Sequence, residues 1–149
     1  MVTTVGHEGD IKSLVRDLIL LENDAIAAYE TAIDKLSDKS LATQVAAFRK
    51  DHLHHLDVLR EMARELAFDP PQSGDIKEFL TTGKVALASL AGDSAILKAM
   101  KSNENDTVTA YRRAAEHGEA VEKSKVFFAH ALADEERHRA WMETTAANL

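Results

Sequence analysis

The sequence predicts an all-α protein, a four-helix bundle made of two helical hairpins, and three observations carry this prediction. Only 2 prolines and 6 glycines interrupt the 149 residues, so long helices can form. Apolar residues recur at helical spacing along four separate stretches. The third observation is an internal repeat: Glu22-Asn23-Asp24 and Tyr29 return as Glu104-Asn105-Asp106 and Tyr111. A fragment that occurs twice indicates two similar halves, each of them a hairpin.

The predicted elements follow in chain order. The first two helices span about Asp10 to Leu36 and Leu41 to Ala67, and Asp69-Pro70-Pro71 stops the second. A shorter helical piece starts after the capping residues 73–75 and reaches Leu90. The other two long helices span Asp93 to about Gly118 and Glu119 to Ala146. We expect one domain, 1–149, with hairpin one at 10–67, a long crossover connection at 68–92 and hairpin two at 93–146.

Charge and composition exclude several classes of function. The formal net charge of −7 and the pI near 5.5 argue against nucleic acid or an anionic membrane as a partner. No apolar run is long enough to span a membrane, and the first residues lack the features of a signal peptide, so we expect a cytoplasmic protein. The absence of cysteine excludes disulfides, iron–sulfur clusters and thiol catalysis. A metal would therefore be held by His, Asp and Glu, which suits iron, manganese or zinc.

Three glutamates interrupt the apolar stripes of the predicted helices. Glu22, Glu104 and Glu135 each lie near the middle of a stripe, in the first, third and fourth long helix respectively. His138 follows Glu135 at i+3, so both side chains lie on one helix face. The pattern predicts polar side chains that point into the bundle at one level.

The second helix offers two pairs of candidate residues. His52 falls at the centre of its apolar stripe and His55 within it, whereas Asp51 lies at the edge and His54 points away. The pair Asp51 and His54 imitates a Glu-x-x-His motif, but helical periodicity favours His52 and His55. The sequence leaves this choice open.

Together these residues predict a metal site. Burying unpaired carboxylates costs several kcal/mol each, so three carboxylates and three histidines facing one another would destabilise an empty core. One or two divalent ions would offset this cost, because carboxylate oxygen and imidazole nitrogen are suitable ligands. The candidate metal ligands are Glu22, His52, His55, Glu104, Glu135 and His138.

These motifs resemble those of the ferritin-like superfamily, in particular rubrerythrin and the small bacterial ferritin-like stress proteins. Glu22 and Glu104 match the single glutamates of the first and third helices in that family, and each has a tyrosine seven residues on. Glu135-x-x-His138 matches the fourth-helix motif. Phe48-x-x-Asp51-His52-x-x-His55 resembles the second-helix motif of the stress proteins. The resemblance covers nearly the whole chain.

The resemblance implies a non-haem diiron protein that reacts with dioxygen or peroxide, as a ferroxidase- or peroxidase-like oxidoreductase. It implies two iron ions per chain, with manganese or zinc, and one ion rather than two, as alternatives. His55 and His138 would be terminal ligands, one per metal. Electrons would come from an external donor or from ferrous iron itself, and a homodimer is the expected assembly.

The sequence departs from the family pattern at one position. His52 stands where the diiron pattern has a metal-bridging glutamate, so three carboxylates are present instead of four. This departure keeps two further hypotheses open, a non-catalytic metal- or iron-binding stress protein and a structural bundle with an unfilled polar core.

Overall fold

The computed structural model describes residues 3–71, 87 and 89–149, and the four long helices lie within these ranges. They are α1 (Ile11–Lys35), α2 (Lys39–Glu65), α4 (Asp93–Ala115) and α5 (Glu122–Ala147). The all-α four-helix bundle predicted from the sequence is thereby confirmed, and the helix ends lie within about three residues of the predicted ones. The shorter helix expected between Ser73 and Leu90 falls mostly on residues 72–86 and 88, which lie outside the described residues.

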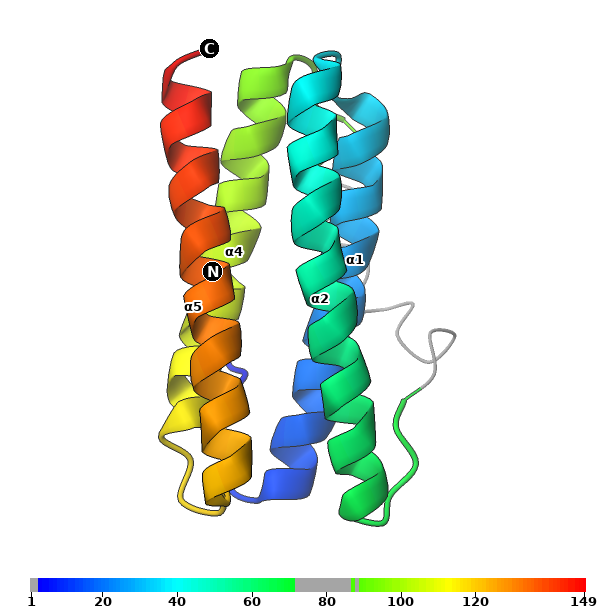
Figure 1. Ribbon diagram of the computed structural model, residues 1–149, viewed down its shortest axis with the longest axis vertical. Helices are drawn as coiled ribbons and strands as arrows, with labels where there is room; N and C mark the ends of the chain where they lie inside the picture. The colour runs from blue at the N-terminus through cyan, green and yellow to red at the C-terminus, as the bar shows by residue number, and fades with distance from the viewer. Residues whose placement is uncertain (1–2, 72–86, 88) are drawn as a thin grey trace.

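The helices form two antiparallel hairpins, α1 with α2 and α4 with α5 (Figure 1). α2 ends at one end of the bundle and α4 begins at the other, so these two helices run in the same direction (Figure 1). The end of α2 and the start of α4 therefore lie at opposite ends of the bundle, too far apart for a tight turn to join them. α1 packs on α4 and α2 lies beside α5, which places all four helices around one axis.

Aspartates cap the starts of two helices, and a third aspartate ties the two hairpins together. The carboxylates of Asp10 and Asp38 accept hydrogen bonds from the amides of Ser13 (2.8 Å) and Ser40 (2.9 Å), as helix N-caps do. Asp93, in the first turn of α4, instead accepts from the amides of Ser37 (2.8 Å) and Asp38 (3.0 Å). This contact ties the α1–α2 turn to the start of hairpin two.

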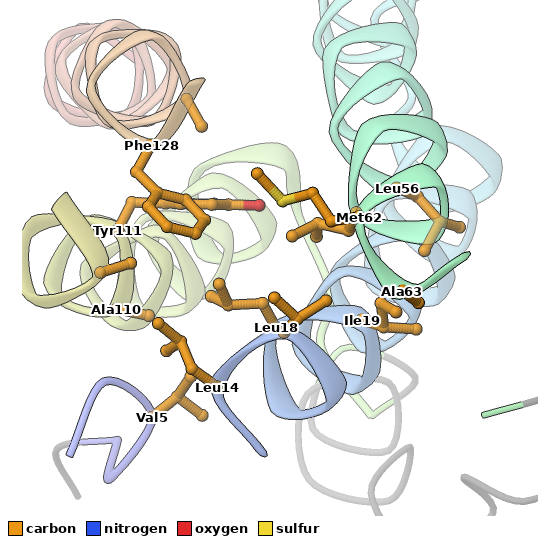
Figure 2. Close-up of a cluster of buried hydrophobic side chains, with 14 of the residues drawn as sticks. Val5, Leu14, Leu18, Ile19, Leu56, Met62, Ala63, Ala110, Tyr111 and Phe128 are labelled. Atoms are coloured by element: carbon orange, nitrogen blue, oxygen red, sulfur yellow. The ribbon is translucent and has the colours of Figure 1, made fainter. Parts of the chain in front are cut away.

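The apolar core consists of two clusters, one toward each end of the bundle. Figure 2 shows the first cluster, in which Tyr111 and Phe128 of hairpin two face Leu18 and Met62 of hairpin one. The second cluster lies further toward the α1–α2 turn and includes Leu36, Val45, Phe48, Leu97, Met100 and Met142. Polar side chains occupy the level between the two clusters, so apolar walls close that level from both ends.

The outer faces of the helices are charged. Arg49 of α2 pairs with Glu30 of α1 (2.7 Å), and Lys101 of α4 pairs with Glu143 of α5 (3.3 Å). Such exposed pairs each contribute at most about 1 kcal/mol to stability, so the buried side chains dominate the packing. Across the described part of the chain, no helix has the length and apolar character needed to cross a membrane.

Candidate metal centre

All six side chains singled out in the sequence meet halfway along the bundle. Each of the four helices contributes to the cluster: Glu22 from α1, His52 and His55 from α2, Glu104 from α4, and Glu135 and His138 from α5. None of them is more than 1% exposed to solvent. Because each lies in the middle of its helix's apolar stripe, packing of the stripes brings them to one level.

One group of potential ligands gathers around Glu22. The Nδ1 atom of His52 lies 2.7 Å from Glu22 Oε2, and Nδ1 of His55 lies 3.2 Å from Glu22 Oε1. Glu135 Oε1 approaches the same His55 Nδ1 to 3.3 Å. One ligand atom from each of these four residues lies within 4.8 Å of the others, which is close enough to surround a metal ion.

A second group adjoins the first and shares two of its members. It consists of His52, Glu104, Glu135 and His138, whose ligand atoms also lie within 4.8 Å of one another. His52 turns its Nδ1 to Glu22 in the first group and its Nε2 to Glu104 in the second, at 3.3 Å. Glu135 places Oε1 beside His55 and Oε2 3.6 Å from His138 Nδ1. The described residues thus contain two adjacent clusters of metal-ligand type.

The structure places the second-helix residues as the periodicity favoured. His52 and His55 are buried, whereas His54 is exposed at the surface. Asp51 lies just outside the cluster, where its Oδ2 is 2.8 Å from His138 Nε2 and accepts a hydrogen bond from Arg137 (2.8 Å). The pair Asp51 and His54 therefore does not face the interior together.

Asp134 contacts His55 in the way that Asp51 contacts His138, and it was not among the residues predicted from the sequence. Its Oδ2 lies 2.8 Å from His55 Nε2, and its Oδ1 accepts a bond from Arg137 at 3.2 Å. Carboxylates in this position orient a histidine so that the opposite nitrogen faces a metal. A signal was present: Asp51 and Asp134 each directly precede an inward-facing residue, His52 and Glu135.

Each of the two tyrosines of the repeat donates a hydrogen bond to a glutamate of the other hairpin. The hydroxyl of Tyr29 in α1 donates to Glu104 in α4, and that of Tyr111 in α4 donates to Glu22 Oε1 in α1 (2.6 Å). The repeated spacing of glutamate and tyrosine therefore produces a reciprocal pair of hydrogen bonds. Each bond fixes the orientation of a carboxylate in the cluster.

Thr107 is a further buried residue that the sequence reasoning missed. Its hydroxyl lies 3.0 Å from Glu104 Oε2 and 2.9 Å from Glu135 Oε2, and so joins α4 to α5 beside the second group. The corresponding position of the first repeat holds Ala25. Thr107 could have been identified from the sequence, because it is a polar residue on a buried helix face where the first repeat has an alanine.

The carboxylates keep the histidines protonated in the absence of a metal. Burial by itself lowers the pKa of His55, but the nearby carboxylates of Glu135 and Glu22 outweigh this effect and raise the pKa to about 10. Burial also lowers the pKa of His138, but the nearby carboxylates of Glu104 and Glu135 outweigh this effect and raise the pKa to about 9. Burial and the adjacent charge of Glu104 raise the pKa of Glu135. In the metal-free protein, protons on the imidazole nitrogens therefore balance the negative charge of the carboxylates. A metal ion would bind to the same nitrogen atoms.

Two atoms in the cluster have no hydrogen-bond partner in the described part of the chain. They are Glu135 Oε1 and His138 Nδ1, both buried and both facing the interior of a group. Unpartnered buried polar atoms cost about 1–3 kcal/mol each, and a metal ion would satisfy both. The donor set, three carboxylates and three imidazoles, also suits iron, manganese or zinc. The residues present therefore fit a divalent metal.

Comparison with known proteins gives a fold relative and a family. The crystal structure of the conserved hypothetical protein rv2844 from Mycobacterium tuberculosis is similar, with a TM-score of 0.76 and 22% sequence identity. The alignment covers 93% of this chain and 98% of that one, and at this identity it shows a shared fold. No curated protein matches the chain. A family model described as a domain of unknown function, DUF2383, matches residues 10–117, a range that contains Glu22, His52, His55 and Glu104. Since this match covers well over half of the sequence, the chain belongs to the DUF2383 family.

Proposed function

We propose that this protein is a ferritin-like metalloprotein whose buried centre binds two divalent metal ions, iron first among them, and reacts with dioxygen or peroxide. The observation that carries the proposal is the pair of ligand groups that share His52 and Glu135. Two adjacent groups with shared members suit two neighbouring ions better than one. The unpartnered atoms Glu135 Oε1 and His138 Nδ1 support the same interpretation.

Each residue has a role under this proposal. Glu22 and His55 would hold one ion and Glu104 and His138 the other, while His52 and Glu135 would face both. Two ferrous ions held there would supply one electron each, which with two protons suffice to reduce one hydrogen peroxide to two waters. The donor that restores the electrons would be another protein or fresh ferrous iron.

The surrounding side chains prepare the site for such a reaction. Tyr29 and Tyr111 hold the carboxylates of Glu104 and Glu22 in position, so little reorganisation is needed when an ion binds. The outer nitrogens of His55 and His138 are held by Asp134 and Asp51. Apolar clusters above and below keep bulk water away, which strengthens every charge interaction in the cluster.

A second candidate function, metal binding without turnover, is favoured by His52. With three carboxylates instead of four, two divalent ions would leave about one uncompensated positive charge in a buried site. Such a site would stabilise the higher oxidation states less well, because these add further positive charge. A protein of this kind would bind and release iron or zinc in a stress response.

The deciding experiment is elemental analysis of metal per chain, before and after anaerobic loading with ferrous iron. An absorption spectrum recorded on exposure to air or peroxide follows. About two irons per chain and a new near-ultraviolet band are expected. One tightly held zinc or manganese ion and no spectral change would support metal binding without turnover. If no metal binds, both proposals fail and a structural bundle is left.

A matched pair of variants locates the binding. Glu135→Gln removes the carboxylate shared by both groups, whereas Glu136→Gln changes the neighbouring, exposed side chain. We expect the first to lower metal content markedly and the second to leave it unchanged. Equal metal content in the two variants would place the bound ion elsewhere.

A further inference from the structure

A pocket of about 360 Å³ opens between α2 and α5 beside the buried centre. Its polar lining consists of His54, His55, Lys123, His130 and Asp134, and its remaining walls are apolar. His55 belongs to the centre itself, so the pocket reaches from solvent to one of the candidate ligands.

The pocket lies in the seam between two helices that pack sparsely against each other. α2 and α5 contact each other less than the other neighbouring pairs of described helices do. At the level of the centre, polar bonds cross this seam, including His55 to Asp134 (2.8 Å) and His138 to Asp51 (2.8 Å). The carboxylates of Asp134 and Asp51 are 33% and 32% exposed, so water reaches these bonds from the surface. An ion that reaches a centre no more than 1% exposed needs such a route.

The pocket also provides suitable ligands outside the centre. His54 and His130 are exposed, and neither side chain has a hydrogen-bond partner among the described residues. Asp134 connects the two regions, because its carboxylate is 33% exposed and also touches His55. Imidazole and carboxylate groups at a surface bind divalent transition-metal ions weakly and exchange them readily.

We propose that this pocket is the docking site at which a divalent transition-metal cation binds before it passes to the buried centre. His54 and His130 on the pocket wall bind the arriving ion transiently, and Asp134 leads it to His55. The proposal rests on the metal centre proposed above and concerns the route to it. The two histidines affect the rate of uptake and leave the final occupancy of the centre unchanged.

The charge of Lys123 predicts the direction in which a substitution changes the rate of metal uptake. Lys123 lies at the mouth of the pocket, 83% exposed, and is 3.4 Å from Glu65. A positive charge there repels an arriving cation, so Lys123→Glu accelerates uptake, and added salt removes the gain by screening. Lys125→Glu makes the same charge change on α5 at a residue that does not line the pocket.

The experiment mixes the metal-free protein with cobalt(II) chloride and follows the fluorescence of Trp141, the single tryptophan of the chain. Trp141 reports on the centre because its ring lies 5.4 Å from that of Phe48, which packs 4.3 Å from His138. We expect the double variant H54A/H130A to take up cobalt at least about five-fold more slowly, with an unchanged final metal content. His7→Ala, an exposed histidine outside the pocket, keeps the wild-type rate.

The outcomes separate failure of the route from failure of the centre. Wild-type uptake rates in H54A/H130A and in Lys123→Glu, with full cobalt content, would overturn the docking site and leave the centre intact. A lower final content in H54A/H130A would show that these histidines belong to the final site, which also overturns it. If the wild-type protein takes up no cobalt or iron, the proposed centre fails together with the route.

Discussion

His52 is the residue at which this centre differs from a four-carboxylate site. Its two nitrogens contact Glu22 and Glu104, one in each ligand group. Burial alone lowers the pKa of His52, but the charges of Glu135 and Glu22 hold it well above the usual value. In the metal-free protein His52 is thus a cation at the middle of the polar layer.

Replacing His52 by glutamate tests this role. His52→Glu exchanges a buried cation for a fourth carboxylate, so we expect the metal-free protein to lose about 3–5 kcal/mol of stability. Divalent metal should then restore more stability than it adds to the wild type, because four carboxylates balance two ions. Thermal denaturation with and without manganese measures both effects. His52→Gln, which carries no charge, is the control, and an equal response to metal in the two variants would contradict the argument.

Thr107 provides a second test at single-residue scale. Thr107→Val keeps the shape but removes the hydroxyl that joins Glu104 and Glu135. We expect a loss of about 1–3 kcal/mol in the free energy of unfolding, because a buried carboxylate oxygen loses its hydrogen-bond donor. Urea denaturation measures the loss. Thr109→Val, at a half-buried threonine of the same helix whose hydroxyl bonds only to its own helix backbone, should change stability by less than about 0.5 kcal/mol.

At the scale of whole elements, half-buried carboxylate–histidine pairs join α2 to α5. Asp51 of α2 holds His138 of α5, and Asp134 of α5 holds His55 of α2. Arg137 contacts both aspartates and so links the pairs at the surface. The seam between these helices is therefore held by side chains that also orient two candidate ligands.

Neutralising one of these aspartates should weaken metal binding without unfolding the bundle. We expect Asp51→Asn to lower metal affinity about 10–100-fold, because His138 loses the anion that orients it and raises its basicity. Competition with a chelator of known affinity gives the constant, and circular dichroism verifies the fold. Asp57→Asn changes an exposed aspartate of the same helix and should have no effect. Equal affinities would assign Asp51 a surface role only.

The segment before α1 is a second element whose role can be tested. Arg113 of α4 donates to the carbonyls of Thr3 (2.8 Å) and Val5 (3.0 Å), and Val5 is part of the core. Gly6 has a φ of +106°, and a Cβ atom there would lie 2.4 Å from the Cβ of Arg113.

Gly6→Ala should therefore detach this segment from α4. We expect a loss of about 1–3 kcal/mol, since both the backbone conformation and the contact with Arg113 are incompatible with a side chain. Differential scanning calorimetry gives the change. Gly9→Ala is the matched control, because a Cβ there meets nothing within 4 Å. A similar effect of both substitutions would refute the steric explanation.

The whole molecule should respond to pH in opposite ways with and without metal. The pKa values of His55 and His138, about 10 and about 9, lie above the value of 6.5 expected for an unfolded chain. Their protonation therefore stabilises the metal-free fold fully below about pH 6.5, and this contribution is lost as pH rises toward 10. Metal binding needs neutral imidazoles, so it releases protons and becomes tighter as pH rises.

Thermal denaturation between pH 6 and 10 tests the first effect, and pH change in a weakly buffered solution on metal addition tests the second. We expect the melting temperature of the metal-free protein to fall across this range. A melting temperature that rises toward pH 10 would show that the histidines are not held protonated by Glu22, Glu104 and Glu135. Denaturation at two salt concentrations is a suitable control, because buried charges are screened little by salt.

The sequence by itself determined the four helices, their hairpin pairing and the level of the polar layer. These follow from local rules: helical periodicity decides which side Glu22, His52 and Glu135 face, and aspartates and prolines mark helix ends. The choice of His52 and His55 over Asp51 and His54 follows from the same periodicity.

Only the tertiary structure decided which side chains touch across helices. Asp134 lies on His55, Tyr29 on Glu104 and Thr107 on Glu135 because of how the helices are rotated and spaced about the bundle axis. Side-chain direction along one helix carries no information about the partner on another, which depends on helix packing. The same holds for the pocket between α2 and α5, since residues far apart in sequence form it only after the two hairpins have packed.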